Sequence, residues 1–362
     1  MLRIAVVGGG VIGMSIAAKL ANEHRVTVLD PEPGCGSSHV AGGMLAPVTE
    51  AWPGEEELLE LGTASLAAWP EFAAGLTDPG LRTEGTLAVG VDSADRGDLR
   101  RLGEYLVSLG REAEELSGRE VRRLEPSLGP AVRLGLSVPG DLAVDNRMLL
   151  RALRRACAEH EVEFADHRVT EVVDGQVVHE TGTFDCDIAI IAAGAHSGAL
   201  HPRLAKLVRP VKGEILRLRA RKGAVRPPLR TVRAQVEGRH SYLVPRDDGG
   251  LVVGATQYET GFDPEVTVGG VRDLLRDAER VLPGLAEYAL LETQAGFRPG
   301  SPDNLPIIGA LSPQVLVATG HGRNGILLAP ITVGGIADLV AGRPVDGPLS
   351  AAGPSRFAEG ER

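Results

Sequence analysis

A glycine-rich turn at the start of the chain constrains the fold more than any other feature of the sequence. The run from Ile4 to Val7 is apolar and rich in β-branched residues, as expected of a buried strand. It leads directly into Gly8-Gly9-Gly10-Val11-Ile12-Gly13, which has the spacing G-x-G-x-x-G, and then into a helical pattern from Val11 to Ala21. A second strand is predicted at Arg25 to Leu29 and ends next to Asp30. This order predicts a Rossmann-type βαβ unit that binds a dinucleotide.

The residues of this turn have separate physical roles in such a unit. Gly8 permits the tight turn, Gly10 lets the backbone approach a pyrophosphate, and Gly13 lets the helix pack closely against the strand. The free N–H groups at the helix N-terminus favour a phosphate there. The Asp30 carboxylate is expected to accept hydrogen bonds from a ribose. A glycine turn that binds no ligand is the alternative interpretation.

A second G-x-G-x-x-G run, from Gly320 to Gly325, lies near the other end of the chain. It follows a predicted strand at Val315 to Thr319 and opens a predicted helix at Ile326 to Ala341. The chain from Arg343 is rich in Pro, Gly and Ser and is expected to be disordered, so no further strand completes a second βαβ unit. The run is therefore interpreted as a helix start that points at the first cofactor. One cofactor contacted from both ends of the chain fits FAD better than NAD.

Length and pattern together predict two domains. A chain of 362 residues exceeds what one hydrophobic core usually supports, and the pattern between residues 208 and 256 becomes that of antiparallel strands. We therefore predict an α+β protein with a discontinuous, Rossmann-type FAD-binding domain at residues 1–80, 141–207 and 295–362. A substrate domain of antiparallel sheet and helices is predicted at residues 81–140 and 208–294. Further helices are expected at Glu55 to Leu76, Ala94 to Leu109, Asn146 to Glu159 and Val268 to Val281.

Charge and cysteine content exclude several classes of function. The chain carries 38 basic and 48 acidic residues, and a net charge of −10 is poorly suited to nucleic acid or to an anionic membrane. Cys35, Cys157 and Cys186 are far apart and form no metal-ligand or redox pair, which favours a reducing compartment. No stretch has the length of a membrane span and no signal segment is visible, so we expect a cytoplasmic protein without a metal.

A series of short motifs runs in a fixed order along nearly the whole chain. After the N-terminal turn come AGGMLAP at 41–47, AAGAHS at 192–197, PVKGE at 210–214, YLVPR at 242–246, VGAT at 253–256, GFRPGS at 296–301, PIIG at 306–309 and GHGRNGILLAP at 320–330. The N-terminal turn and AAGAHS are each common to many flavoproteins, but the ordered set is not. The chain resembles the glycine and D-amino acid oxidase family of flavoenzymes, most closely the glycine oxidases of thiamine biosynthesis.

The resemblance implies which residues contact FAD. They are Gly8, Gly10, Val11, Ile12 and Gly13 at the pyrophosphate turn, Asp30 and Pro31 near the ribose, Ser37 and Ser38 facing phosphate, Gly42, Gly43 and Met44 along the flavin, the Val169 backbone at adenine, Gly194, and His321, Gly322, Arg323, Asn324, Gly325, Ile326 and Leu327 beside flavin N1 and O2. Asp30 replaces the glutamate usual in relatives, and His39 lies where a smaller residue is expected. No cysteine lies near residues 290–330, so the flavin is expected to be bound non-covalently.

The resemblance also implies a binding site for a substrate carboxylate. Arg298 matches the family's carboxylate-binding arginine, whose planar fork holds a carboxylate bidentately, and Tyr242 matches the phenol that shares that carboxylate. Arg323 and Met44 are expected to shape the same pocket, although Arg323 is equally consistent with a structural role. His240 either lines this side or is a solvated loop histidine. Without their motifs, Arg298 and Tyr242 would be interpreted as a surface arginine and a buried strand tyrosine.

The implied reaction needs no general base, because the amino acid gives its α-hydrogen as hydride to flavin N5. Glycine is the expected substrate, with sarcosine and small D-amino acids, and the products would be glyoxylate, ammonia or an amine, and peroxide from oxygen. Alternative interpretations are a D-amino acid dehydrogenase, a sarcosine-oxidase-like amine oxidoreductase, and a flavin-binding assembly or regulatory subunit without turnover. The resemblance also suggests a homo-oligomer.

Overall fold

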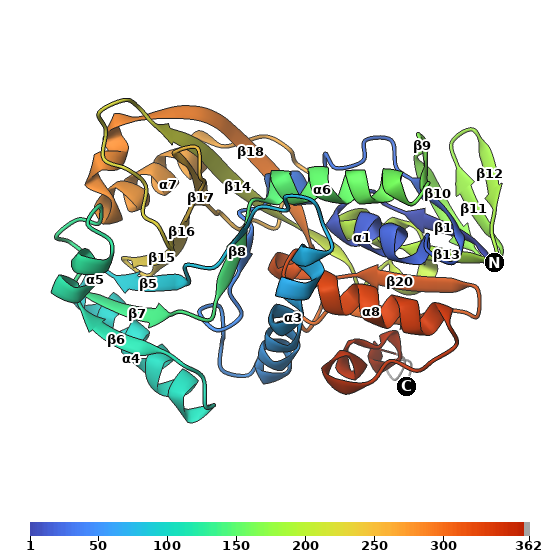
Figure 1. The fold of residues 1–362 in the computed structure, drawn as a ribbon, viewed down its shortest axis with the longest axis horizontal. Coiled ribbons are helices and arrows are strands. Elements are labelled where there is room, and N and C mark those ends of the chain that lie inside the picture. Colours follow the sequence, from blue (N-terminus) through green and yellow to red (C-terminus); the bar gives the residue numbers. More distant parts are fainter. Residues whose placement is uncertain (358–362) are drawn as a thin grey trace.

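Six strands form a mostly parallel sheet in one half of the molecule in the computed structural model, which describes residues 1–357 (Figure 1). Their order is β19 (Ile307–Ala310), β20 (Val315–Thr319), β13 (Ile188–Ile191), β1 (Arg3–Val7), β2 (Arg25–Leu29) and β9 (Glu163–Ala165). Only the edge strand β19 is antiparallel to its neighbour. A parallel sheet of this kind has to bury both faces, and both are covered here.

One face of this sheet is covered by helices. They are α1 (Val11–Leu20), α3 (Glu56–Ala74), α6 (Asn146–Glu159) and α8 (Ala329–Val340), which share a core with the apolar side chains of β1, β2 and β13. The opposite face packs against a small antiparallel sheet of β10 (Val169–Val173), β11 (Gln176–His179) and β12 (Gly182–Asp185), and against the 3₁₀ turns η1 (Gly194–Ala199) and η2 (Pro202–Leu204).

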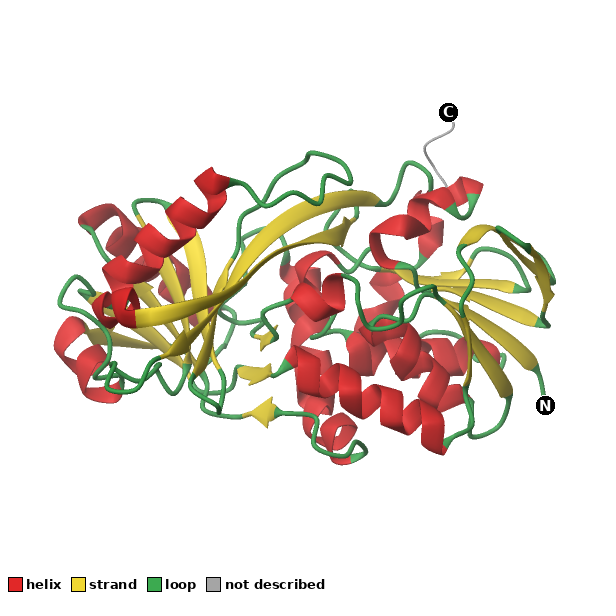
Figure 2. Ribbon diagram, turned by 90° about the horizontal axis from the view of Figure 1, so that it is seen from above, coloured by secondary structure: helices red, strands yellow, loops and turns green. Residues whose placement is uncertain are grey.

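Eight strands form the second large sheet, at the other end of the molecule (Figure 2). Their order is β18 (Tyr288–Gly300), β14 (Arg209–Ala220), β17 (Gly250–Gly254), β16 (Arg239–Pro245), β15 (Thr231–Val236), β5 (Thr86–Gly90), β7 (Leu134–Val138) and β6 (Glu114–Ser117). All neighbours are antiparallel except β15 and β5. The helices α4 (Ser93–Ser108), α5 (Gly118–Leu124) and α7 (Val268–Val281), and the 3₁₀ turn η3 (Pro283–Glu287), belong to this half.

Strand alternation gives the eight-stranded sheet two different faces. On β14, Leu216 and Leu218 point into the core that the sheet shares with α7. Gly213, Ile215 and Arg217 therefore lie on the opposite face, since successive side chains of a strand alternate. Ile215 packs there with residues of the first half, as part of the cluster Val40, Met44, Ala143, Ile215, Tyr242, Val244, Val252 and Ala255. This second face is the surface that meets the dinucleotide-binding half.

Short elements connect the two halves. The strands β3 (Met44–Leu45), β4 (Leu81–Arg82) and β8 (Leu142–Val144) form a small sheet of their own, and α2 (Ser37–Val40) precedes it. None of the helices between residues 1 and 357 is both long and apolar enough to cross a bilayer.

The predicted fold class is confirmed, because the structure contains a Rossmann-type βαβ sheet and a second, mostly antiparallel sheet. The predicted boundary at residue 295 falls inside β18, whose full length pairs with β14 of the second sheet. We therefore propose that the last FAD-binding segment begins after Gly300. The long strand β18 itself was not predicted.

Two expectations near the C-terminus were wrong. The helix expected to start at Ile326 starts at Ala329, with Pro330 in its first turn, and residues Gly322–Asn324 form the separate 3₁₀ turn η4. The second glycine run therefore does not open an α-helix directly. The chain after Arg343 was expected to be disordered, yet it forms the 3₁₀ turns η5 (Gly347–Ala352) and η6 (Pro354–Phe357). Leu349 and Ala352 are buried against α8 and its surroundings, and residues 358–362 lie outside the described range.

Candidate active site

The N-terminal turn has the sterics that a dinucleotide-binding turn requires. Gly8 has φ of +109°, and a Cβ there would lie 2.5 Å from the Ala192 carbonyl oxygen. A Cβ on Gly13 would overlap the Gly8 carbonyl oxygen. Both positions therefore exclude any side chain, which is the role expected of the first and last glycines of the fingerprint.

The start of α1 leaves donors available for a phosphate. The Val11 amide donates to the Ser38 hydroxyl at 3.1 Å, and the first α1 backbone bond goes from Met14 to Gly10. Within residues 1–357, the amides of Ile12 and Gly13 have no hydrogen-bond acceptor. Free amides at a helix N-terminus suit the pyrophosphate of FAD, so these residues fit the expected cofactor.

The half-buried Asp30 carboxylate holds this turn by accepting two backbone hydrogen bonds. One of its oxygens accepts from the Gly9 amide at 2.6 Å, and the other accepts from the Glu32 amide at 2.7 Å, beyond Pro31. Ser37, predicted to face phosphate, uses its hydroxyl on the backbone of Phe297, from which it accepts at 3.1 Å and to which it donates at 2.5 Å. Ser37 therefore ties the nucleotide-binding loop to β18.

The segment predicted to line the flavin is held in a narrow slot between the two halves. Gly43 has φ of +84°, and its carbonyl accepts from the Val144 amide at 2.7 Å. A Cβ on Gly42 would lie 2.8 Å from the ring of Tyr242. Met44 follows in β3, paired with Ala143 of β8. The slot accepts this segment only because two consecutive residues lack side chains.

A buried polar cluster fixes the same segment from behind. Asn146 donates through Nδ2 to the carbonyls of Ser38 and His39, each at 2.8 Å. Its Oδ1 accepts from Arg217 and from Arg246, each at 3.2 Å. Arg217 also donates to the His39 carbonyl, and Arg246 to the Gly42 carbonyl at 2.8 Å. His39, whose local turn the sequence left open, therefore takes part through its backbone.

In this part of the described structure, three arginines (Arg147, Arg217 and Arg246) share two carboxylate partners. Burial, together with the charge of Arg147, lowers the pKa of the Arg217 guanidinium to about 10. Arg246 forms an ion pair with Asp145 at 3.2 Å, and Arg147 forms a bidentate ion pair with Glu292, with N···O distances of 2.9 and 2.6 Å. The cluster is therefore a cationic region behind the flavin-lining segment.

The second glycine run reaches the same place from the C-terminal end. The buried His321 side chain hydrogen-bonds to Thr332 of α8 at 3.1 Å, and burial lowers its pKa to about 3, so the ring is neutral at pH 7. The Nε2 atom of His321 is therefore engaged within the protein, with α8. The Leu327 carbonyl accepts from Ser65 at 2.7 Å and from Trp69 at 2.9 Å, both on α3. Asn324 and Ile326 are buried between these anchors, with Gly325 between them in sequence.

Open space adjoins two other glycines predicted to contact the cofactor. Gly194 and Gly322 both have φ of +55°, and a Cβ on either would meet no atom within 4 Å. The Gly194 carbonyl accepts from Thr319 at 3.0 Å, at the end of the neighbouring strand β20. Val169 begins β10, beside this sheet. These positions therefore leave room for a ligand at the carboxyl ends of the parallel strands, where such sheets bind nucleotides.

Arg298 lies on the face of the eight-stranded sheet that meets the first half. Its Cζ would lie 2.5 Å from a Cβ on Gly213, so the guanidinium crosses the backbone of β14 only because Gly213 has no side chain. Its Nη1 donates to the Thr256 carbonyl at 3.2 Å, and Thr256 in turn accepts from the Glu214 amide at 2.9 Å. Within residues 1–357, Arg298 makes no ion pair, which leaves its charge available for an anion.

Tyr242 lies on the same face, between two glycines. A Cβ on Gly254, its partner on β17, would overlap the phenol group, and a Cβ on Gly42 would lie 2.8 Å from the same ring. Burial raises the pKa of the Tyr242 hydroxyl, and the nearby charge of Arg298 only partly opposes this. The phenol therefore stays protonated at neutral pH and can donate to a carboxylate that Arg298 also binds.

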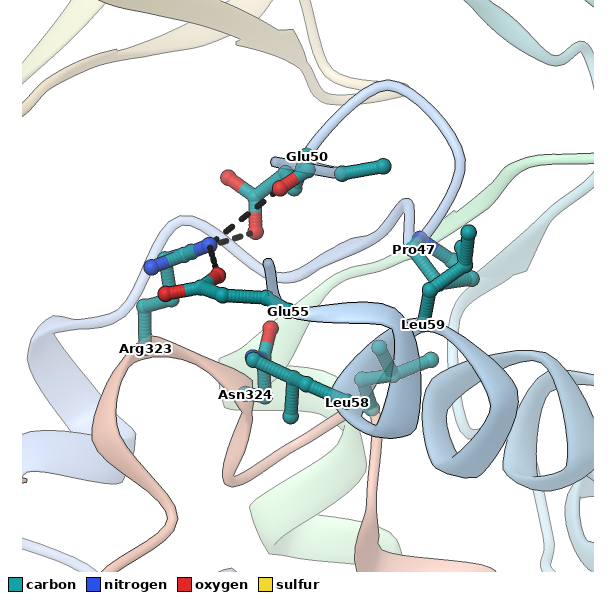
Figure 3. A pocket seen from close by; sticks show the side chains of 9 residues that line it. Pro47, Glu50, Glu55, Leu58, Leu59, Arg323 and Asn324 are labelled. Atoms are coloured by element: carbon teal, nitrogen blue, oxygen red, sulfur yellow. Dashed lines mark hydrogen bonds and ion pairs between the residues drawn. The ribbon is translucent and has the colours of Figure 1, made fainter. Parts of the chain in front are cut away.

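The Arg323 side chain extends toward Glu50 and Glu55, as Figure 3 shows. It donates to the Glu50 carbonyl at 3.2 Å and pairs with the Glu50 carboxylate at 3.5 Å and the Glu55 carboxylate at 3.3 Å. These residues line a small cavity at the start of α3 together with Pro47, Leu58 and Leu59. His240 meets Trp52 edge-to-face at 5.6 Å between ring centroids.

Sequence reasoning missed Gly213, Asn146 and Glu50. Gly213 could have been found, because it lies inside the PVKGE motif, where only a close approach explains a glycine in a long strand. Asn146 and Glu50 gave no signal, since each acts on residues far away in the sequence.

Comparison with known proteins agrees with this geometry. Residues 3–339 match the family of FAD-dependent oxidoreductases. The chain is 36% identical to the bifunctional protein ThiO/ThiG of Trichormus variabilis over 98% of its own length and 55% of that protein's, so it spans about half the length of this relative. It is 33% identical to the glycine oxidase of Geobacillus kaustophilus over 93% of this chain and 92% of that one.

Solved structures of oxidases have the same fold as this chain. The crystal structure of the Geobacillus kaustophilus glycine oxidase superposes with a TM-score of 0.88 at 31% identity, covering 99% of this chain and all of that one (100%). The iminodiacetate oxidase of Chelativorans sp. BNC1 superposes with a TM-score of 0.83 at 26% identity, covering 97% of this chain and 100% of that one.

The contact between Gly213 and Arg298 generates a prediction. Changing Gly213→Ala should displace the guanidinium and weaken the binding of a small carboxylate such as acetate by at least about tenfold, because a charged anchor is lost. Perturbation of the flavin absorption spectrum measures this binding. Gly296→Ala is the matched control, since its Cβ would meet the Val40 side chain at 3.1 Å rather than the guanidinium. Equal acetate affinity in both variants and the wild type would contradict the assigned contact.

Proposed function

The chain belongs to the FAD-dependent oxidoreductases and is glycine oxidase-like, and from this membership we propose that it oxidises glycine, with sarcosine and small D-amino acids as further substrates. The observation that carries the proposal is the pair of Arg298 and Tyr242 on one sheet face. Three glycines, at positions 42, 213 and 254, clear the space around this pair.

The chain's own residues bind and orient the substrate. The Arg298 fork donates two hydrogen bonds to the carboxylate, and the Tyr242 hydroxyl donates a third. The Thr256 carbonyl holds the guanidinium in place at 3.2 Å. A carboxylate fixed at three donors directs the α-carbon toward the segment 42–44, which lines the expected flavin position. Orientation of this kind contributes to the rate because it removes the entropy cost of alignment.

FAD, when bound, supplies the two-electron acceptor for the α-hydrogen. No side chain is needed as a general base, because the α-hydrogen leaves the substrate as hydride and not as a proton. Burial lowers the pKa of His240, so this ring is neutral and does not compete for the carboxylate. The oxidised amino acid, an imine, hydrolyses to glyoxylate and ammonia, and oxygen is reduced to hydrogen peroxide.

The wider role rests on the bifunctional relatives. The name of these relatives joins a ThiO part to a ThiG part, and this chain matches about half of their length. We propose that the product supplies thiamine thiazole synthesis, with the chain acting as a homo-oligomer in the cytoplasm.

A substrate panel tests the proposal. Peroxide formation should be faster with glycine and sarcosine than with D-phenylalanine, because Gly42, Gly254 and Met44 leave a small space beside Tyr242. L-amino acids should fail, since their side chain would occupy the position needed for alignment. Reduction of an artificial dye without oxygen uptake would instead identify a dehydrogenase of the same family.

Arg298 variants test the carboxylate site. Arg298→Ala should weaken glycine binding by about 2–5 kcal/mol, as for truncated charge pairs at interfaces, and Arg298→Lys should restore only part of it because lysine lacks the fork. FAD content and the visible spectrum should remain near those of the wild type. A flavin-loaded Arg298→Ala protein with an unchanged apparent affinity for glycine would remove Arg298 from the site.

We further propose that FAD is held without a covalent bond. The cysteines support this, because Cys157 lies on α6 and Cys186 just before β13, while Cys35 lies in the loop before α2. None is part of the segments 42–44 or 320–328. Acid precipitation should therefore release all of the yellow colour into the supernatant, and colour retained in the washed pellet would show a covalent link.

A further inference from the structure

Residues 46–55 form a loop between β3 and α3 that is fixed in place by one buried carboxylate. Asp141 is fully buried and accepts from the Val48 amide at 3.3 Å, the Thr49 amide at 3.2 Å and the Thr49 hydroxyl at 2.7 Å. Arg233 of β15 donates to the Thr49 carbonyl from the other side. The next residue, Glu50, therefore has a defined backbone position although the 46–55 loop has no regular structure.

The 46–55 loop covers the sheet face that carries Tyr242. Arg233 is the direct cross-strand partner of Tyr242 in the antiparallel pair of β15 and β16. Side chains of such partners project from the same face and are neighbours. His240, two residues before Tyr242, shares this face and contacts Trp52 of the loop. Glu50, which pairs with Arg233, is thus next to the substrate site proposed above.

Glu50 bridges the two halves of the molecule. Its carboxylate lies 3.5 Å from Nη2 of Arg233, on the eight-stranded sheet, and 3.5 Å from Nε of Arg323, on the second glycine run. The Glu50 side chain is only 12% exposed, so solvent screens these charges weakly. Figure 3 shows Glu50 and Glu55 converging on Arg323.

Arg233, Arg323 and Arg298 differ in whether a carboxylate of the protein already neutralises them. Arg233 and Arg323 each have a carboxylate partner, and both share Glu50. Arg298 has a carbonyl partner and, within residues 1–357, no ion pair. A substrate thus finds one unpaired cation at Arg298 and a partly buried anion at Glu50.

We propose that Glu50 sets the charge selectivity of the substrate site, by excluding amino acids that carry a second carboxylate. The inference rests on the proposed oxidation of small amino acids. A substrate with one carboxylate binds at Arg298 and Tyr242 and leaves Glu50 undisturbed. A second carboxylate, on the amine or on the side chain, meets the Glu50 charge and finds Arg233 and Arg323 already neutralised. Removal of the Glu50 charge frees Arg233 for that second carboxylate, while Arg323 keeps its pair with Glu55.

The test compares two substrates that differ in one group, sarcosine and iminodiacetate, which are N-methyl and N-carboxymethyl glycine. Glu50→Gln keeps the size of the side chain and an oxygen for the arginines but removes the charge. We expect the ratio of kcat/KM for iminodiacetate to that for sarcosine to rise at least tenfold, with sarcosine itself changed less than threefold. Glu55→Gln is the matched control, because it removes the other partner of Arg323 and leaves Glu50 in place. Its ratio should change less than threefold.

A ratio in Glu50→Gln equal to that of the wild type, or a parallel loss for both substrates, would overturn the proposal. If the variant does not hold FAD, the wild-type protein decides. Titrated through the flavin spectrum, it should bind malonate at least tenfold more weakly than propionate, and equal affinity would overturn the proposal. This binding measurement needs no turnover. Failure of the proposed oxidation therefore remains distinguishable from failure of the selectivity.

Discussion

The arrangement of the two halves depends on the buried amide of Asn146. It accepts from Arg217 and Arg246 of the eight-stranded sheet and donates to the carbonyls of Ser38 and His39 in the nucleotide-binding half. Buried guanidinium groups are costly unless hydrogen-bonded, and a hydrogen bond to a charged group typically contributes about 1.5–3 kcal/mol. Any sliding of one half over the other would leave several of these donors unpaired. The halves therefore dock in one register, and that register sets the geometry of the site.

The two halves can pack this closely because three positions at their interface are glycines, which have no side chain. Gly42 and Gly254 enclose the Tyr242 ring, and Gly213 passes beneath the Arg298 guanidinium. A methyl group at any of the three would displace the aromatic ring or the charged fork. The carboxylate-binding pair is thus held by backbone surfaces, which deform less than side chains. The same close packing limits the volume next to the α-carbon of a substrate.

Charge is distributed unevenly around this pair. The cluster of Arg217, Arg246 and Arg147 lies behind the flavin-lining segment, and its carboxylate partners among residues 1–357 are Asp145 and Glu292. On the opposite side, Glu50 and Glu55 neutralise Arg323, and Glu50 also pairs with Arg233. An anion therefore meets an attractive region at Arg298 and a compensated one at the 46–55 loop. The distribution of charge around the site therefore depends on which arginines form ion pairs with carboxylates of the protein.

The sequence by itself determined the local structures whose cause is local. The glycines of the first turn, the strands around them and the helix from Asn146 to Glu159 follow from sterics and periodicity within a few residues, and they were predicted with nearly the observed ends. The strand β18 escaped prediction because Gly296, Pro299 and Gly300 interrupt its pattern. It is nevertheless an edge strand, where a proline costs no ladder hydrogen bond on the open side. The tail after Arg343 has the composition of a disordered segment, yet it is ordered because Leu349 is buried against α8.

Only the tertiary structure decided which distant residues meet. The motifs identified Arg298 and Tyr242 as a pair, but their spacing said nothing of Gly213 beneath the guanidinium. Arg323 was expected near the flavin, and its actual partners are Glu50 and Glu55. Glu50 itself gave no signal, because an acidic residue in a loop is ordinarily solvated. It acquires a role only where the sheet brings Arg233 to one side and the second glycine run brings Arg323 to the other. Long-range ion pairs depend on the docking of whole sheets, and that docking is not encoded in any short stretch of sequence.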